Sequence, residues 1–204
     1  MSVGNFLSAK NLHKNLVMNR RIRVLANRIE ELIPNNSSIL DVGAGSGEIA
    51  NTILSKRPDL DITCIDIKNR DDTEIEIKSF NGKEIDYEDS SFDFAIIVDV
   101  LHHTYNKKEL LREAFRVSKT GVIIKDHLYK NKLDHAILSI MDYIGNRPYS
   151  IDVIYDYFTL EQWEVLFNEE KMIISGLNID LHLYPFPFNL IFDRQLHMLV
   201  MLTK

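Results

Sequence analysis

The sequence predicts an α/β fold in three layers: a seven-stranded, mostly parallel sheet whose last strand is antiparallel, with helices on both faces. Three observations support this. Strand-like and helix-like apolar patterns alternate along the chain until a final pair of strands. A glycine-rich turn at residues 43–47 joins the first strand to a helix. The continuous apolar run at residues 94–98 is typical of a strand buried on both faces of a parallel sheet.

Each element is predicted from its own pattern. Helices are expected where apolar residues recur at three- and four-residue intervals, and strands where they alternate or run continuously. Pro34 ends the first helix, and Thr159 and Gln162 form a capping box at the start of a later one. We expect helices at residues 22–33, 48–56, 107–118, 131–145 and from 159 onward, and strands at residues 39–42, 61–66, 74–80, 94–98, 122–124, 172–183 and 195–202.

Composition restricts the class of protein. The 204 residues suffice for one domain with a full core, and the net charge of −6 argues against a protein that mainly grips nucleic-acid phosphates. Cys64, the only cysteine, is expected in the core and cannot form an internal disulfide. No apolar run approaches the ~20 residues of a membrane span, and the N-terminus lacks a signal-peptide pattern. We expect a cytoplasmic protein that binds neither membrane nor nucleic acid. The polar side of the first helix is expected to be a solvated face carrying Arg20, Arg21, Arg23 and Arg28.

The glycine-rich turn has the pattern D-x-G-x-G-x-G, from Asp41 to Gly47. Glycines allow the backbone to approach a ligand closely because they have no Cβ. The dinucleotide fingerprint G-x-G-x-x-G is broken by Glu48. The pattern instead resembles motif I of the class I S-adenosylmethionine (SAM)-dependent methyltransferases. Because SAM carries a cationic amino group and a sulfonium rather than phosphates, Asp41 is suited to hold its methionine end. The alternative is a glycine turn that binds nothing.

Asp66 ends the second predicted strand, one strand-turn-helix-strand unit after Asp41. In a right-handed βαβ crossover the ends of two such strands are neighbours. The two carboxylate oxygens of Asp66 are therefore suited to accept both ribose hydroxyls. The alternative is that Asp66 caps a helix or turn.

Other motifs resemble the methyltransferase type 11 family, which includes the ubiquinone/menaquinone methyltransferases. Residues 85–93 are similar to the family's L-P-F-x-D-x-S-F-D, residues 101–103 to its L-H-H, and residues 111–117 to its L-R-E-A-F-R-V. The chain departs from the family at Asn81, where an acid usually meets the adenine amino group. It departs again at residues 119–121, where K-P-G-G is usual.

The resemblance implies a Rossmann-like fold and a SAM-dependent methyltransferase whose product is S-adenosylhomocysteine. The expected partner is a small-molecule acceptor with an oxygen or nitrogen nucleophile, and the protein is expected to be a monomer or homodimer. The alternative function is a protein of the same fold that binds SAM or a nucleotide without turnover. The implied cofactor-binding residues are Asp41, Gly43, Ala44, Gly45, Gly47, Asp66, Ile67, Asn81, Gly82 and Asp99.

The ends of the fourth and fifth strands could supply the chemistry, because ligands sit at this edge of such sheets. In one interpretation, His127 or His103 is a general base, since imidazole titrates near pH ~6.5. In a second, Asp99 and Asp126 hold a divalent metal in a placement similar to catechol O-methyltransferase. In a third, these residues only cap helices and satisfy strand ends. We select His127, His103 and Asp126 as catalytic candidates and assign no metal ligand. The polar residues at these ends are Asp99, His102, His103, Lys125, Asp126 and His127.

The whole chain, residues 1–204, is expected to form one domain, because it contains no repeat, low-complexity tract or linker. Tyr149 and Tyr157 either line an acceptor pocket or belong to the core. The expected parts are an N-terminal helical cap (1–36), a cofactor-binding core (37–130), a substrate-covering insertion with a helix (131–170) and a final strand pair (171–204).

Overall fold

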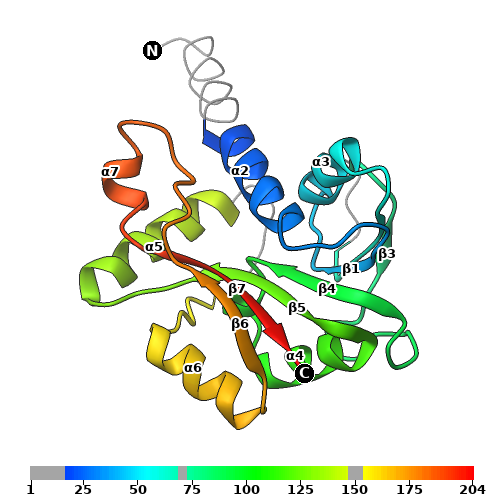
Figure 1. Cartoon of the computed structure of the whole chain (residues 1–204). Helices are drawn as coiled ribbons and strands as arrows, with labels where there is room; N and C mark the ends of the chain where they lie inside the picture. The colour runs from blue at the N-terminus through cyan, green and yellow to red at the C-terminus, as the bar shows by residue number, and fades with distance from the viewer. Residues whose placement is uncertain (1–16, 69–72, 147–153) are drawn as a thin grey trace.

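The computed structural model describes residues 17–68, 73–146 and 154–204, which form a seven-stranded sheet flanked by helices (Figure 1). The strand order is β3-β2-β1-β4-β5-β7-β6. Neighbouring strands from β3 to β5 run parallel, whereas β7 is antiparallel to both β5 and β6. The predicted sheet is therefore confirmed. The strands are β1 Ser38–Val42, β2 Asp61–Asp66, β3 Ile77–Ser79, β4 Phe92–Val98, β5 Ser118–His127, β6 Ile173–Asn178 and β7 His197–Thr203.

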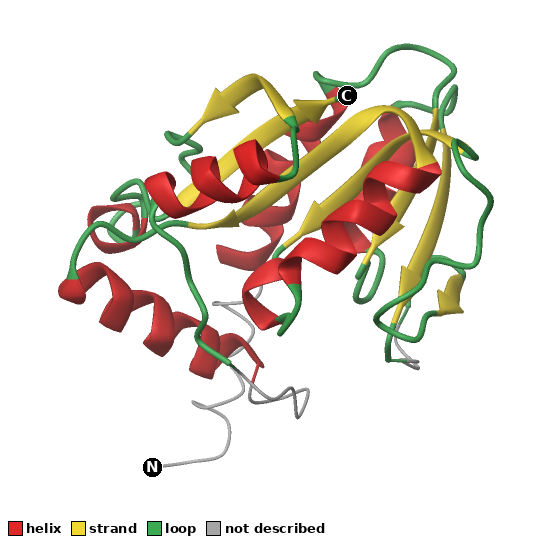
Figure 2. Ribbon diagram, turned by 90° about the horizontal axis from the view of Figure 1, so that it is seen from below, coloured by secondary structure: helices red, strands yellow, loops and turns green. Residues whose placement is uncertain are grey.

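Helices cover both faces of this sheet (Figures 1 and 2). Thr159 and Gln162 form the predicted capping box at the start of α6. No helix in the described ranges is long and apolar enough to cross a membrane. The helices are α2 Asn19–Glu30, α3 Glu48–Lys56, α4 Lys107–Val117, α5 Lys132–Asn146, α6 Leu160–Glu169 and α7 Asn189–Phe192, and Leu101–His103 forms a 3-10 turn, η2.

Alternating residues of the central strands supply two separate cores, and this produces the three layers. In β4, Phe94 and Ile96 pack in the core beneath α2 and α3. Ala95 and Ile97, which point the other way, pack in the core beneath α4 and α6. Trp163 of α6 is fully buried in that second core, and its Nε1 donates to a carbonyl oxygen of β5 at 3.2 Å. Helices on both faces thus hold the strand ends in fixed positions.

Three strands, β3, β5 and β6, differ most in length from the prediction. β3 spans residues 77–79 rather than 74–80, because it is an edge strand that pairs with β2 only. β5 spans residues 118–127 rather than 122–124, because β7 pairs with it along most of its length. Residues 179–183 leave the sheet instead of extending β6. The segment between β6 and β7 contains the short helix α7.

Gly121 marks a close approach of β5 to β7. A Cβ at this position would overlap the carbonyl oxygen of Leu202, a backbone atom that cannot move aside. We expect Gly121→Ala to lower the free energy of unfolding by about 1–3 kcal/mol, measured by urea denaturation. Gly145→Ala in α5 is the matched control, because a Cβ there has no neighbour within 4 Å. It should be neutral or stabilising by less than ~1 kcal/mol. If both substitutions destabilise the protein equally, the loss at position 121 does not come from the contact with Leu202.

Candidate cofactor and acceptor site

The glycine turn between β1 and α3 lies at the carboxyl edge of the sheet. Its backbone N–H groups at Gly43 and Ala44 donate to the Ile65 carbonyl oxygen at 2.8 and 3.1 Å, which ties the turn to β2. Gly43 has a φ of 78°, and a Cβ there would overlap a methyl group of Val100. Gly45 and Gly47 also have positive φ angles, of 63° and 78°. The turn therefore depends on its glycines, as the sequence predicts.

Asp41 places a carboxylate beneath this turn with one oxygen available. The residue is 2% exposed, and its Oδ1 has no hydrogen-bond partner among the described residues. Burial, together with the neighbouring charge of Asp66, raises the pKa of Asp41 to about 7. A buried carboxylate with a free lone pair is destabilised when ionised and is stabilised by a cationic ligand group.

Asp66 ends β2 beside the turn, as predicted. Its Oδ2 accepts the Gly45 backbone N–H at 2.8 Å, and its Oδ1 accepts the Lys68 N–H at 2.8 Å. Each carboxylate oxygen has a further lone pair, so Asp66 can still accept two ligand hydroxyls. The side chain thus shapes the turn and keeps the capacity to accept further hydrogen bonds.

The residues expected near adenine lie around the loop that follows β3. Ile67 is 64% exposed, and a Cβ on Gly82 would lie 3.3 Å from its side chain, so the two residues are neighbours. The Asn81 Oδ1 accepts the backbone N–H groups of Lys83 and Glu84 at 2.8 and 2.9 Å. Asn81 therefore stabilises its own loop, and its amide NH₂ is the group left to face a ligand.

A buried polar cluster occupies the ends of β4 and β5, where the acceptor was expected. It draws side chains from α2, β4, η2, β5 and α5. The sequence predicted the side chains at the two strand ends. It did not predict that α2 and α5 each contribute one. We call it the strand-end cluster, and it consists of Arg21, Asp99, His102, Lys125, Asp126, His127 and Asp142.

Asp99 is the ionic centre of the cluster. Lys125, which is fully buried, and Arg21 both donate to its carboxylate. Burial would raise the pKa of Asp99, but the charges of Arg21 and Lys125 hold it well below its usual value. The expectation that Arg21 belongs to a solvated face is wrong. Its side chain is only 17% exposed, because α2 packs with this residue over the end of β4.

Asp126 holds His102 in place rather than facing open space. Fully buried, its carboxylate accepts the His102 Nδ1 at 2.7 Å and the backbone N–H groups of Leu101 and His127 at 3.1 and 2.6 Å. The His102 Nε2 lies 3.3 Å from Asp142. Burial would lower the pKa of His102, but these two carboxylates raise it to about 10. The contacts with Asp126 and Asp142 therefore favour the protonated form of His102.

The two predicted catalytic histidines are neutral at physiological pH. Burial, and then the charges of Lys125 and His102, lower the pKa of His127. The ring of His103 lies 3.9 Å from that of His102, centroid to centroid, and burial and the charge of His102 lower the pKa of His103 to about 4. A neutral imidazole can accept a proton, so both residues are in the state that a general base requires.

Asp142 and His197 were not selected from the sequence, and Tyr157 was considered only as a residue of an acceptor pocket or of the core. The Tyr157 hydroxyl donates to Asp142 Oδ2 at 2.5 Å, and His197 Nδ1 lies 3.1 Å from His127 Nδ1. Tyr157 is 4% exposed and packs as part of the core, whereas Tyr149 lies outside the described residues. The available signal was Asp142 itself, a charged residue directly preceded by Ile140 and Met141 and followed by Tyr143 and Ile144.

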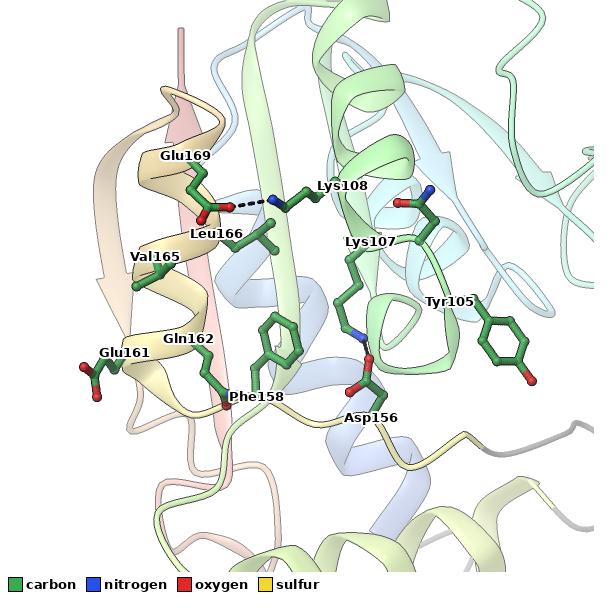
Figure 3. Close-up of a pocket in the computed structure, with 11 residues that line it drawn as sticks. Tyr105, Lys107, Lys108, Asp156, Phe158, Glu161, Gln162, Val165, Leu166 and Glu169 are labelled. Atoms are coloured by element: carbon green, nitrogen blue, oxygen red, sulfur yellow. Dashed lines mark hydrogen bonds and ion pairs between the residues drawn. The ribbon is translucent and has the colours of Figure 1, made fainter.

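A separate pocket of about 530 Å³ opens between α4 and α6 (Figure 3). Two ion pairs border it, Lys107 with Asp156 and Lys108 with Glu169. None of its lining residues belongs to the glycine turn or to the strand-end cluster. We therefore assign the pocket no part in binding the cofactor.

Comparison with known proteins supplies the family. Residues 17–170 match the model described as a methyltransferase domain. The chain is 31% identical over 161 residues to the ubiquinone/menaquinone biosynthesis C-methyltransferase UbiE of Rickettsia felis, covering 66% of this chain and 65% of that protein. It is 34% identical over 105 residues to the UbiE of Rickettsia akari, covering 43% and 42%. The chain thus spans 42–65% of the length of these curated relatives.

Solved structures share the fold. A SAM-dependent methyltransferase from Methanosarcina mazei is 21% identical with a TM-score of 0.60, over 86% of this chain and 96% of that one. Another, from Aquifex aeolicus, is 12% identical with a TM-score of 0.58, over 94% and 92%. The sheet order and the glycine turn are those of the class I SAM-dependent methyltransferases. The chain belongs to the methyltransferase domain family of that class.

Proposed function

We propose that this protein transfers a methyl group from SAM to a small-molecule acceptor bound at the strand-end cluster. The observation that carries the proposal is the buried, unpartnered carboxylate oxygen of Asp41 beneath the glycine turn. NAD would bring a pyrophosphate to this place, whereas SAM brings a cationic amino group. The residues present therefore fit the cofactor of the family.

The chain's own residues divide the binding of SAM between them. Asp41 would attract the cationic methionine end, and Asp66 would accept the ribose hydroxyls. The backbone of the glycine turn, with Ala44 at its centre, allows close approach. Ile67 and Gly82 would flank the adenine. When bound, SAM supplies an electrophilic methyl group, so the protein needs mainly to orient the acceptor and exclude water.

Histidines in and beside the strand-end cluster would handle the proton of the acceptor. We assign His103, which is partly exposed and neutral, as the proton acceptor, with His127 as the second candidate. Asp126 is a positioning residue, because its carboxylate is already saturated with hydrogen bonds. Asp99, which the resemblance implies as a cofactor-binding residue, is held by Arg21 and Lys125. A nearby base matters only when the acceptor nucleophile carries a proton.

A hydroxy-aromatic compound is the acceptor class that we favour. The UbiE relatives are named as C-methyltransferases of ubiquinone and menaquinone biosynthesis. When a hydroxyl on an aromatic ring loses its proton, both the oxygen and the adjacent ring carbons become nucleophilic, so one base serves O- or C-methylation. A neutral amine acceptor would attack through its own lone pair, and the base would take the proton that the methylated nitrogen then releases.

The function is tested by calorimetric titration with SAM and S-adenosylhomocysteine, followed by incubation with SAM and a panel of phenols, quinols and amines. We expect one-to-one micromolar binding of both ligands, and S-adenosylhomocysteine release that depends on an added acceptor. Binding without release across the panel would favour the non-catalytic alternative. Absence of binding to either ligand would overturn the assignment of the glycine turn.

The affinity for SAM is expected to depend on pH through Asp41. Because its pKa is raised to about 7, the carboxylate is mostly protonated below that pH and cannot attract a cation. Between pH 5.5 and pH 7, calorimetry should show the dissociation constant for SAM falling by about tenfold. Asp41→Asn should bind weakly with little pH dependence across the same range. An equal pH dependence in the variant would assign the effect to another group.

A further inference from the structure

We propose that His102, His127, Asp142 and Asp99 form a binding site for a divalent transition-metal ion of the zinc type. The four residues come from η2, β5, α5 and the end of β4. Two imidazoles with carboxylates form a mixed nitrogen and oxygen donor set, which suits zinc and its first-row neighbours better than magnesium. Of these four residues, Asp99 is also among those implied to bind the cofactor, whereas His102, His127 and Asp142 are not.

The spacing of the donor atoms fits a bound ion. Asp142 spans the two imidazoles, with Oδ2 lying 3.3 Å from His102 Nε2 and Oδ1 lying 3.5 Å from His127 Nε2. Asp99 Oδ1 lies 3.6 Å from the same His127 atom. Donor atoms of Asp99, His102 and His127 lie within 4.8 Å of one another. In a tetrahedral site with bonds of about 2.0–2.1 Å, neighbouring donors are about 3.3–3.4 Å apart.

The other nitrogen of each imidazole is already held. His102 Nδ1 is bonded to Asp126 at 2.7 Å, and His127 Nδ1 lies 3.1 Å from His197 Nδ1. Histidines that bind metals characteristically use one ring nitrogen for the ion and the other for a carboxylate or similar partner, which fixes the ring orientation. Both Nε2 atoms are therefore directed toward Asp142 by contacts made on the far side of each ring.

The charges of the cluster leave room for a further cation. Within the described part of the chain, the cluster encloses three carboxylates, Asp99, Asp126 and Asp142, together with two basic side chains, Arg21 and Lys125. Buried charges are costly unless they are balanced. An ion held between the imidazoles and the carboxylates would add positive charge to this acidic set. If the bound ion also held an oxygen of the acceptor, that further role would rest on the proposed function. Metal binding itself does not rest on it.

The test uses the full chain after removal of metals, titrated with Zn²⁺ by calorimetry and with Co²⁺ by visible absorption. We expect one ion per chain and the intense visible absorption of a low-coordinate Co²⁺ site. Asp142→Asn should weaken binding of both ions at least tenfold, and His127→Gln provides a second ligand variant. His182→Gln is the control, because this histidine is exposed on the segment between β6 and β7.

SAM affinity, measured in the same samples, separates this proposal from the proposed function. We expect Asp142→Asn and His127→Gln to bind SAM as the unaltered protein does, which also shows that they are folded. The metal site is overturned if the unaltered protein binds neither ion, or if both ligand variants bind Zn²⁺ and Co²⁺ as tightly as the His182→Gln control. Failure of the unaltered protein to bind SAM would instead count against the proposed function.

Discussion

Replacing Asp66 with alanine is expected to weaken SAM binding 10- to 100-fold. The Asp66 carboxylate stands at the end of β2, is 7% exposed and already anchors the Gly45 backbone N–H. Its proposed bonds to the ribose hydroxyls are charge-assisted, and losing such bonds costs about 1.5–3 kcal/mol. Isothermal titration of the purified variant with SAM measures the effect directly.

Two further variants separate the ligand contact from the shape of the turn. Asp66→Asn retains an oxygen that can accept the Gly45 N–H but loses the charge, so we expect an affinity between those of the alanine variant and the unaltered protein. Asp61→Ala removes an exposed acid at the opposite end of β2 and should leave binding unchanged. Unaltered affinity in Asp66→Ala would remove the ribose assignment.

Replacing Asp99 with asparagine is expected to lower the free energy of unfolding by about 3–5 kcal/mol. The substitution leaves the ammonium group of Lys125 enclosed without its partner carboxylate, and removing one member of a buried ion pair carries a cost of this size. Arg21 suffers less, because its side chain is 17% exposed and can turn toward water. Urea denaturation in the presence of a chelator measures the change in the metal-free protein.

The matched control removes the unpaired charge as well. In Asp99→Asn combined with Lys125→Met, an apolar side chain of similar length replaces the ammonium group. We expect the double variant to recover at least ~1 kcal/mol relative to the single variant, which is a coupling between the two sites. If the double variant is no more stable than Asp99→Asn, the loss arises from packing around β4 and not from the stranded lysine.

Local patterns specified the fold because each strand and helix carries its own apolar period. The run at residues 94–98 required burial on both faces, and the structure places it in the centre of the sheet. The capping box of Thr159 and Gln162 was readable because its partners are three residues apart. Strand lengths were less predictable, since β7 pairs with β5 from Gly121 to His127, and that pairing joins residues 70 to 82 positions apart.

The cofactor side of the candidate site was also accessible from the sequence. Asp41 and the glycines lie close together in the chain, at alternate positions. Asp66 follows after one βαβ unit, so topology alone brings these residues together. The contacts of Asn81 were not accessible in this way: its oxygen accepts the Lys83 and Glu84 N–H groups. A loop's internal hydrogen bonds depend on its backbone path, which composition does not reveal.

By itself, the sequence determined the α/β sheet, the glycine turn and the two acids that flank it, because these features depend on neighbouring residues and on one standard crossover. Only the tertiary structure decided how the strand-end cluster is built. In the sequence pattern, Arg21 has the position of a solvated residue of α2, and Asp142 stands next to apolar residues of α5. Both side chains nevertheless reach the ends of β4 and β5. Which buried charges meet is settled by the packing of α2 and α5 over the sheet, and no local pattern encodes that choice.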